Sequence, residues 1–182
     1  MAAMQPGPEV TVAAVTEVAG RFLLVEERIN GRLVFNQPAG HVEHGETLLA
    51  AVVREAREET AWHFEPQSLL GVYLWCKPAS ERTVLRFAFT GEVSNHDDSR
   101  PLDHGIVGTH WFTPLELDER RSQAIQIVRR GIARSRNRSA RPISRLKGNR
   151  RRLRGCVPRR PQDHERNHQC KERIVPIHGA PQ

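Results

Sequence analysis

The chain has 182 residues, 38% hydrophobic and 27% charged, which is typical of a globular domain rather than a fibrous or disordered chain. No run of 18 apolar residues occurs, which argues against a membrane-spanning helix, and the opening residues lack the basic and apolar regions of a secretory signal. Three cysteines are too few and too scattered for a disulfide framework, so a cytoplasmic protein is expected.

The formal net charge of +7 divides into two opposed parts. Residues 1–120 carry 10 Lys/Arg and 18 Asp/Glu, a net of −8, whereas residues 121–182 carry 18 Lys/Arg and 3 Asp/Glu, a net of +15. The second part also lacks Trp, Tyr and Phe. This asymmetry predicts two bodies of different character, a folded domain over residues 1–121 and a basic tail over residues 122–182.

The first elements of the domain are predicted to be strands. Residues 10–15 are apolar and β-branched, and residues 21–26 follow after Ala19-Gly20, so these two segments are expected to form a hairpin. Asn30-Gly31 favours a turn because both residues tolerate a positive φ, and a short strand over residues 33–35 follows it.

The segment Pro38-Ala39-Gly40 is expected to end that strand and open a loop. From Thr47 to about Thr60, apolar residues recur at spacings of three and four, which predicts an amphipathic helix. Further strands are predicted over residues 69–76, 83–93 and 108–112, the last with Trp111 in the core. A final helix should begin at Thr113-Pro114.

Carboxylates gather on the other face of the first helix. Glu55 lies three residues before Glu58 and four before Glu59, so the three share a face expected to point away from the core. Like charges repel there, and a hard divalent cation such as Mg²⁺ would relieve the repulsion because it prefers oxygen ligands. Arg54 would orient or partly neutralise Glu58 four residues later. An ordinary solvated acidic surface is the alternative interpretation.

The segment from Gly40 to Ala61 resembles the Nudix box, the signature of the Nudix hydrolase family. The pattern is Gly, five residues, Glu, seven residues, Arg-Glu, two residues, Glu-Glu, one residue and Gly. Its first six fixed positions are occupied by Gly40, Glu46, Arg54, Glu55, Glu58 and Glu59. Ala61 stands where the family has Gly, at a helix end that normally uses a left-handed residue. Alanine there is expected to cost about 1 kcal/mol without removing activity.

The resemblance implies an α/β protein with the Nudix-type α/β/α sandwich and a mixed β-sheet. It also implies an enzyme that hydrolyses phosphate compounds with Mg²⁺, or alternatively Mn²⁺. Further likeness to bacterial phosphatases of the family, carried by residues 26–31, 35–43, 85–89 and 103–106, implies nucleoside tri- and diphosphates as substrates. The hydroxymethylpyrimidine diphosphate of thiamine metabolism is implied as well.

The resemblance also implies a role for each matched residue. The box glutamates and a backbone carbonyl would bind the metal, with the glycine, an upstream glutamate and the arginine positioning them. Glu58 would be the general base for the attacking water. The implied metal ligands are Glu55, Glu58, Glu59 and the Ala39 carbonyl, and the implied positioning residues are Gly40, Glu46 and Arg54.

Three further residues are candidates for substrate binding. Asn36 and Gln37 precede the box loop and are suited to hydrogen-bond the edge of a ring. Arg86 lies on a predicted strand and either reaches a phosphate or forms a surface ion pair. The partner is expected to be a small phosphorylated substrate, with no membrane, and the protein a monomer or homodimer.

Two other functions remain open at this stage. The chain could be a pyrophosphohydrolase of nucleotide sugars or dinucleotides, which would yield two phosphorylated products rather than inorganic phosphate. It could also be a catalytically weak Nudix module that binds nucleotides or RNA and gains affinity from its basic tail.

The tail itself has three interpretations. Residues 147–154 would attract nucleic acid nonspecifically through their arginines, although the tail lacks aromatic residues for base stacking. Cys156, His164, His168 and Cys170 could bind zinc, but their spacing fits no standard finger. The abrupt change of composition near residue 121 is also what an out-of-frame translation would produce, and such a segment would lack the apolar content to fold alone.

Overall fold

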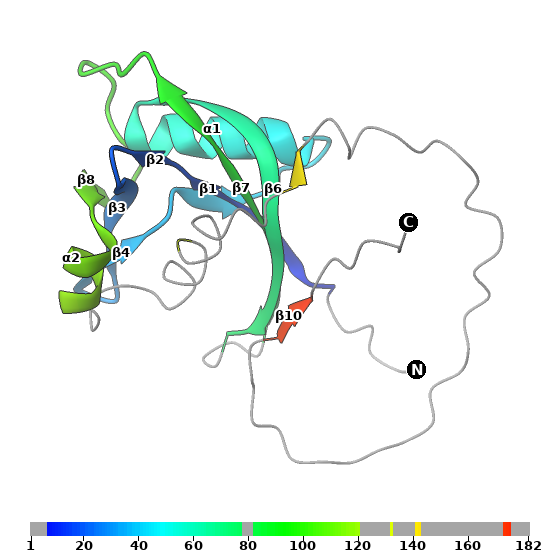
Figure 1. Ribbon diagram of the computed structural model, residues 1–182. Helices are drawn as coiled ribbons and strands as arrows, with labels where there is room; N and C mark the ends of the chain where they lie inside the picture. Colours follow the sequence, from blue (N-terminus) through cyan, green and yellow to red (C-terminus); the bar gives the residue numbers. More distant parts are fainter. Residues whose placement is uncertain (1–6, 78–81, 121–131, 133–140, 143–172, 176–182) are drawn as a thin grey trace, which may run out of the picture.

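The computed structural model describes residues 7–77, 82–120, 132, 141–142 and 173–175. These residues form two β-sheets, a long helix and a short helix (Figure 1). In chain order the elements are β1 (Glu9–Val15), β2 (Glu17–Val18), β3 (Arg21–Ile29), β4 (Arg32–Asn36), β5 (Ala39–His41), α1 (Leu48–Thr60), β6 (His63–Cys76), β7 (Thr83–Ser94), β8 (Ile106–Phe112), α2 (Pro114–Glu119), β9 (Arg141–Pro142) and β10 (Arg173–Val175).

The larger sheet contains both parallel and antiparallel pairs. β1 runs parallel to β7 along its whole length and antiparallel to β5 on its other side. β6 pairs antiparallel with β7, and the short strands β9 and β10 pair with β6. In the smaller sheet, β3 pairs antiparallel with β2, β4 and β8. The predicted α/β fold with a mixed sheet is therefore confirmed.

Apolar cores lie on both faces of the larger sheet. Because side chains alternate along a strand, Val12 and Ala14 of β1 pack with Val52 of α1, whereas Ala13 points to the opposite core. That second core contains Phe112 of the smaller sheet and a buried side chain of α2. Helix α1 thus covers one face of the larger sheet, while the smaller sheet and α2 cover the other (Figure 1).

The predicted hairpin between residues 10–15 and 21–26 is wrong. β1 belongs to the larger sheet and β3 to the smaller one. The turn at Ala19-Gly20, with positive φ at both residues, joins β3 only to the two-residue strand β2. The chain changes sheet at this point because β1, whose side chains are buried on both faces, pairs with β7 and β5 instead.

The predicted loop at Pro38-Ala39-Gly40 is also partly wrong. Ala39 and Gly40 belong to β5, which pairs with β1 at the edge of the larger sheet. The Ala14 N–H donates to the Pro38 carbonyl at 2.8 Å, which extends the pairing by one residue. Proline lacks an N–H, so it is tolerated at the beginning of such an edge strand. This pairing fixes the box glycine against the sheet.

The predicted helix and turn are confirmed. α1 begins after Thr47, whose side chain accepts a hydrogen bond from Ala50 N at 3.1 Å. Asn30 and Gly31 adopt φ of 50° and 77° between β3 and β4. α2 begins after Thr113, which forms a complete capping box.

The described part of the chain contains no helix long and apolar enough to span a bilayer. Trp111, predicted to be a core residue, is only half-buried. The basic segment 147–154 and the candidate zinc ligands Cys156, His164, His168 and Cys170 lie outside the described residues. The predictions made for the tail therefore stay predictions.

Candidate active site

The site is assembled where α1 packs against the edge strand β5. Gly40 of β5 lies directly against the Glu55 side chain of α1, so closely that a Cβ built on Gly40 would overlap the Glu55 carboxylate. The φ of Gly40 is not in the left-handed region, so the glycine is required here for close approach. Gly40 and Glu55, the first and fourth fixed positions of the box, are thus in direct contact in the folded protein.

Arg54 connects four other parts of the box. Its Nε and Nη2 donate to the two oxygens of Glu46, both at 3.0 Å, in a bidentate pair. Its Nη1 donates to Glu55 Oε1 at 2.8 Å and to Glu58 Oε2 at 3.0 Å. Nη2 also donates to the His41 carbonyl at 3.0 Å. A guanidinium has five N–H donors in a fixed plane, so it can form this bidentate pair and the other bonds together, whereas a lysine has three donors and no fork.

Two of the three box carboxylates on α1 are buried, contrary to the expectation that the acidic face points away from the core. Glu55 and Glu59 are 8% and 9% exposed, because β5 closes over this face of the helix. Glu59 Oε2 accepts a hydrogen bond from Ala39 N at 2.7 Å. The Glu58 side chain is 36% exposed and lies at the rim. The helix therefore presents two inner carboxylates and one outer carboxylate.

Burial changes the protonation of these groups. It raises the pKa of Glu59 to about 8, against the opposing hydrogen bond from Ala39, and the nearby charge of Glu55 adds to this rise. Burial also raises the pKa of Glu55, although Arg54 opposes the effect. In contrast, the hydrogen bonds from Arg54 hold the pKa of Glu46 below its ordinary value. In the metal-free protein at neutral pH, Glu59 therefore retains a proton.

The donor set suits a hard divalent cation. Glu55, Glu58 and Glu59 supply carboxylate oxygens, and the peptide of Ala39 is held against Glu59 by its N–H. Within residues 7–77 and 82–120, no three acidic, His or Cys side chains are already gathered closely enough to hold an ion. Arg54 draws oxygens of Glu55 and Glu58 toward itself. An incoming cation would thus compete with the guanidinium for these oxygens.

The three candidate substrate residues occupy different settings. The Asn36 side chain accepts a hydrogen bond from the Gln37 backbone N at 2.9 Å, which is a local contact. Gln37 is 2% exposed, and its Nε2 has no hydrogen-bond partner among the described residues. Arg86 is 8% exposed, bonds Thr11 Oγ1 at 3.3 Å and stacks over Trp75 at 5.2 Å. The surface ion pair considered for Arg86 is therefore wrong.

Two acidic residues beside the site were missed by the sequence analysis. The charges of Glu27 on β3 and Asp103 in the β7–β8 loop both raise the pKa of Glu59. Glu27 Oε1 is buried without a partner among the described residues, and the backbone N of Asp103 donates to the Glu58 carbonyl at 3.0 Å. No spacing rule links either residue to the box. The available signal was the likeness of residues 26–31 and 103–106 to bacterial phosphatases, since these segments contain Glu27 and Asp103.

Comparison with known proteins identifies this arrangement. A family model described as a NUDIX domain matches residues 5–131, well over half of the chain, so the protein belongs to the Nudix family. Nudix hydrolases generally use divalent metals, in agreement with the oxygen-rich donor set. The protein is a hydrolase that acts on phosphate compounds.

Three individual proteins show how similar this chain is to known members of the family. The chain is 41% identical over 110 residues to Phosphatase NudJ of Escherichia coli K12, covering 60% of this chain and 71% of that protein. A NUDIX hydrolase from Nitrosomonas europaea superposes with a TM-score of 0.74 and 39% identity, covering 79% of this chain and 98% of that one. A MutT NUDIX hydrolase from Burkholderia pseudomallei, with a TM-score of 0.61 and 22% identity over 71% and 98% of the two chains, shares the fold.

Proposed function

We propose that the protein is a Mg²⁺-dependent phosphatase or pyrophosphatase of nucleoside tri- and diphosphates and of the pyrimidine diphosphate precursor of thiamine. Mn²⁺ is the alternative ion. The observation that carries the proposal is the contact between Gly40 and Glu55, with Arg54 tying Glu55 and Glu58 to Glu46. These contacts, with the hydrogen bond from Ala39 N to Glu59, hold the three carboxylates of α1 beside the edge strand β5, where the phosphates of a substrate are expected to lie.

In this proposal Glu55, Glu58, Glu59 and the Ala39 carbonyl hold the ion. Bound Mg²⁺ supplies charge neutralisation to the phosphates and lowers the pKa of a bound water. The partly exposed Glu58 accepts the proton of the attacking water, because it is the most exposed of the three carboxylates on α1. Arg54 keeps Glu58 oriented through the 3.0 Å hydrogen bond from its Nη1.

Substrate recognition is assigned to residues on the strands beside β5. Arg86 is a buried cation that pairs with no carboxylate at ion-pair distance among the described residues, so it has charge available for a phosphate. Its own burial lowers its pKa to about 10, which leaves it protonated at neutral pH. The unpartnered Gln37 amide and the Asn36 side chain are assigned to the ring of the substrate.

The test is a phosphate- and pyrophosphate-release screen over nucleoside tri- and diphosphates and pyrimidine diphosphates, with Mg²⁺ or Mn²⁺ varied. Glu58→Gln should lower kcat by about 10²–10⁴-fold, because this is the usual contribution of a general base. Glu65→Gln is the matched control, since Glu65 is an exposed carboxylate on β6. No release from any of these substrates with either ion would contradict the proposal. Two phosphorylated products from nucleotide sugars would favour a pyrophosphohydrolase, and RNA binding without turnover a binding module.

A further inference from the structure

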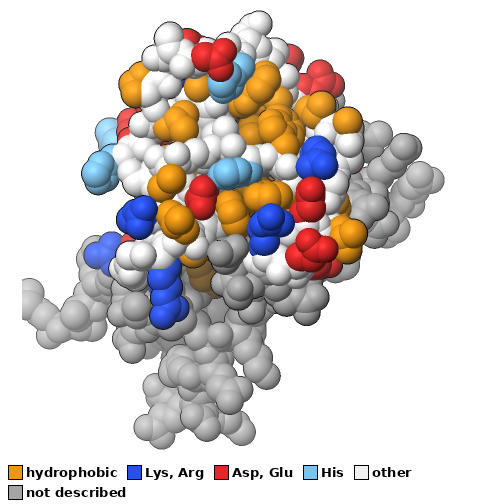
Figure 2. Space-filling view, turned by 90° about the vertical axis from the view of Figure 1, so that its left-hand side faces the viewer, with side chains coloured by type: hydrophobic (Ala, Val, Ile, Leu, Met, Phe, Trp, Pro, Cys, Tyr) orange, Lys and Arg blue, Asp and Glu red, His pale blue; other side chains and the backbone are white. Residues whose placement is uncertain are grey.

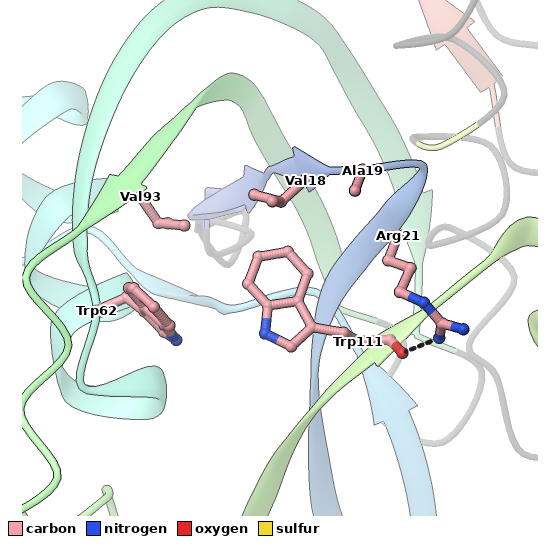
Figure 3. A pocket seen from close by; sticks show the side chains of 6 residues that line it. All are labelled: Val18, Ala19, Arg21, Trp62, Val93 and Trp111. Carbon is pink, nitrogen blue, oxygen red and sulfur yellow. Dashed lines mark hydrogen bonds between the residues drawn. The ribbon is translucent and has the colours of Figure 1, made fainter.

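A second concave site lies beyond the C-terminal end of α1. It is a cavity of about 500 Å³, a size typical of small-molecule sites. None of the residues assigned to hydrolysis lines it. The walls come from β2 and its turn, β3, the end of α1, β7 and β8, and the lining residues are Val18, Ala19, Arg21, Trp62, Val93 and Trp111 (Figure 3).

Two indoles form an aromatic corner in this cavity. The rings of Trp62 and Trp111 stand 6.3 Å apart at 84° to one another. The ring of His96 packs against Trp62, with the ring centroids 4.6 Å apart. A planar ring that enters can stack on one indole and meet the other edge-on, and both arrangements are favourable for aromatic groups.

The opposite end of the cavity carries the guanidinium of Arg21, which is ion-paired with Glu116 at 3.0 Å. Figure 3 shows Arg21 on the far side of Trp111 from Trp62, next to Ala19. Its Nη1 donates to the Trp111 carbonyl at 3.1 Å and to Glu116 Oε2 at 3.0 Å, and these contacts fix the guanidinium in place. No hydrogen bond from its Nε or Nη2 is described, and the side chain is 47% exposed. Two donor groups therefore remain for an anion.

The cavity is open to solvent on the side of the β2 turn. Val18 is 52% exposed at its edge. On the face shown in Figure 2, hydrophobic side chains gather in small groups between charged ones. Apolar concave surfaces with a few fixed polar groups are typical of ligand sites. An aromatic corner, an ion-paired guanidinium with two unused donor groups and an open edge together define the ligand chemistry.

We propose that this cavity binds a planar heteroaromatic ring that carries an anionic group, as in a nucleoside monophosphate. The ring stacks on Trp62 or Trp111, and the anionic group accepts hydrogen bonds from Arg21. Such a ligand is a separate molecule, bound independently of hydrolysis, because a nucleotide whose phosphates lie at the box has no anionic group left for Arg21.

Intrinsic fluorescence tests the site directly, because Trp62 and Trp111 are two of the three tryptophans in the chain. The full-length protein, without metal, is titrated with AMP, adenosine and ribose 5-phosphate. We expect AMP to quench the emission with the highest affinity, adenosine to bind more weakly and ribose 5-phosphate to leave the emission unchanged. A Trp75→Phe background confines the signal to the two lining indoles.

Two exposed valines provide a matched pair of variants. Val18 and Val107 are both 52% exposed, but only Val18 lines the cavity. Val18→Asp places a negative charge beside the anion position, and we expect it to weaken AMP binding about fivefold, the usual size of one partly exposed charge interaction. Val107→Asp should leave AMP binding unchanged. No quenching by AMP, or equal weakening by both variants, would overturn the proposal.

Competition then tests whether this ligand is separate from the substrate. With Mg²⁺ present, quenching by AMP that persists at saturating nucleotide substrate supports a separate site. AMP that competes with the substrate, together with a raised KM in Val18→Asp, would assign the cavity to the ring of the substrate and overturn the proposal. Because the titration is performed without metal, failure of the hydrolysis proposal leaves this test unaffected.

Discussion

Glu59 offers a quantitative test of the site through the pH dependence of stability. Glu59 is 9% exposed, and this burial raises the pKa of its carboxyl group from 4.5 to about 8. A group whose pKa is raised in the folded state stabilises the fold fully below its unfolded pKa. That stabilisation is lost as the pH rises toward the folded value. Metal-free protein should therefore lose stability between about pH 4.5 and pH 8 because of Glu59.

The size of the effect follows from the two pKa values. At about 1.4 kcal/mol per pKa unit, a rise from 4.5 to about 8 corresponds to about 5 kcal/mol, an upper limit for this group. Domains of this size are usually stable by about 5–15 kcal/mol, so the loss should be plainly measurable. In Glu59→Gln the side chain does not ionise and its amide oxygen can still accept the Ala39 N–H, so this loss should disappear.

Urea denaturation in the presence of EDTA, repeated from about pH 5 to pH 8.5, measures the difference between wild type and Glu59→Gln. The unfolding free energy of the wild type should fall relative to the variant as the pH rises. Added Mg²⁺ should restore the wild type at the alkaline end and leave the variant nearly unchanged. Parallel curves for the two proteins across this range would refute the assignment of Glu59 as a buried, proton-bearing ligand.

Three further variants test other parts of the site. Gly40→Ala should displace Glu55 and weaken Mn²⁺ binding, followed by electron paramagnetic resonance, about 10–100-fold, whereas Gly7→Ala, which meets nothing within 4 Å, should not. Ala61 has φ of 60°, so Ala61→Gly should raise the unfolding free energy by about 0.5–1 kcal/mol and increase Tm; an unchanged or lower Tm would argue against strain at this cap. Arg54→Lys keeps the charge but loses the fork, so kcat should fall about tenfold or more with an unchanged circular dichroism spectrum. Full activity in this variant would mean that charge alone suffices.

The sequence by itself was enough to predict the local features of the site. The start of α1 at Thr47 and the turn at Asn30-Gly31 depend on side chains and φ preferences within a few residues. Ala61 adopts the left-handed conformation expected at the end of the helix and donates its N–H to the Arg57 carbonyl. Short-range interactions act in the same way wherever the segment lies in the fold, so the spacing of residues suffices to predict them.

Only the tertiary structure decided which surfaces these elements meet. β1 pairs with β7, 75 residues further along the chain, and this pairing excludes it from the predicted hairpin. The same packing carried β5 over α1 and buried Glu55 and Glu59, which the helical pattern alone placed in solvent. Trp111, which the strand pattern placed in the core, instead lines a cavity together with Trp62. A periodic pattern shows which face of an element is apolar, but the burial of a polar face depends on the distant strand that packs against it.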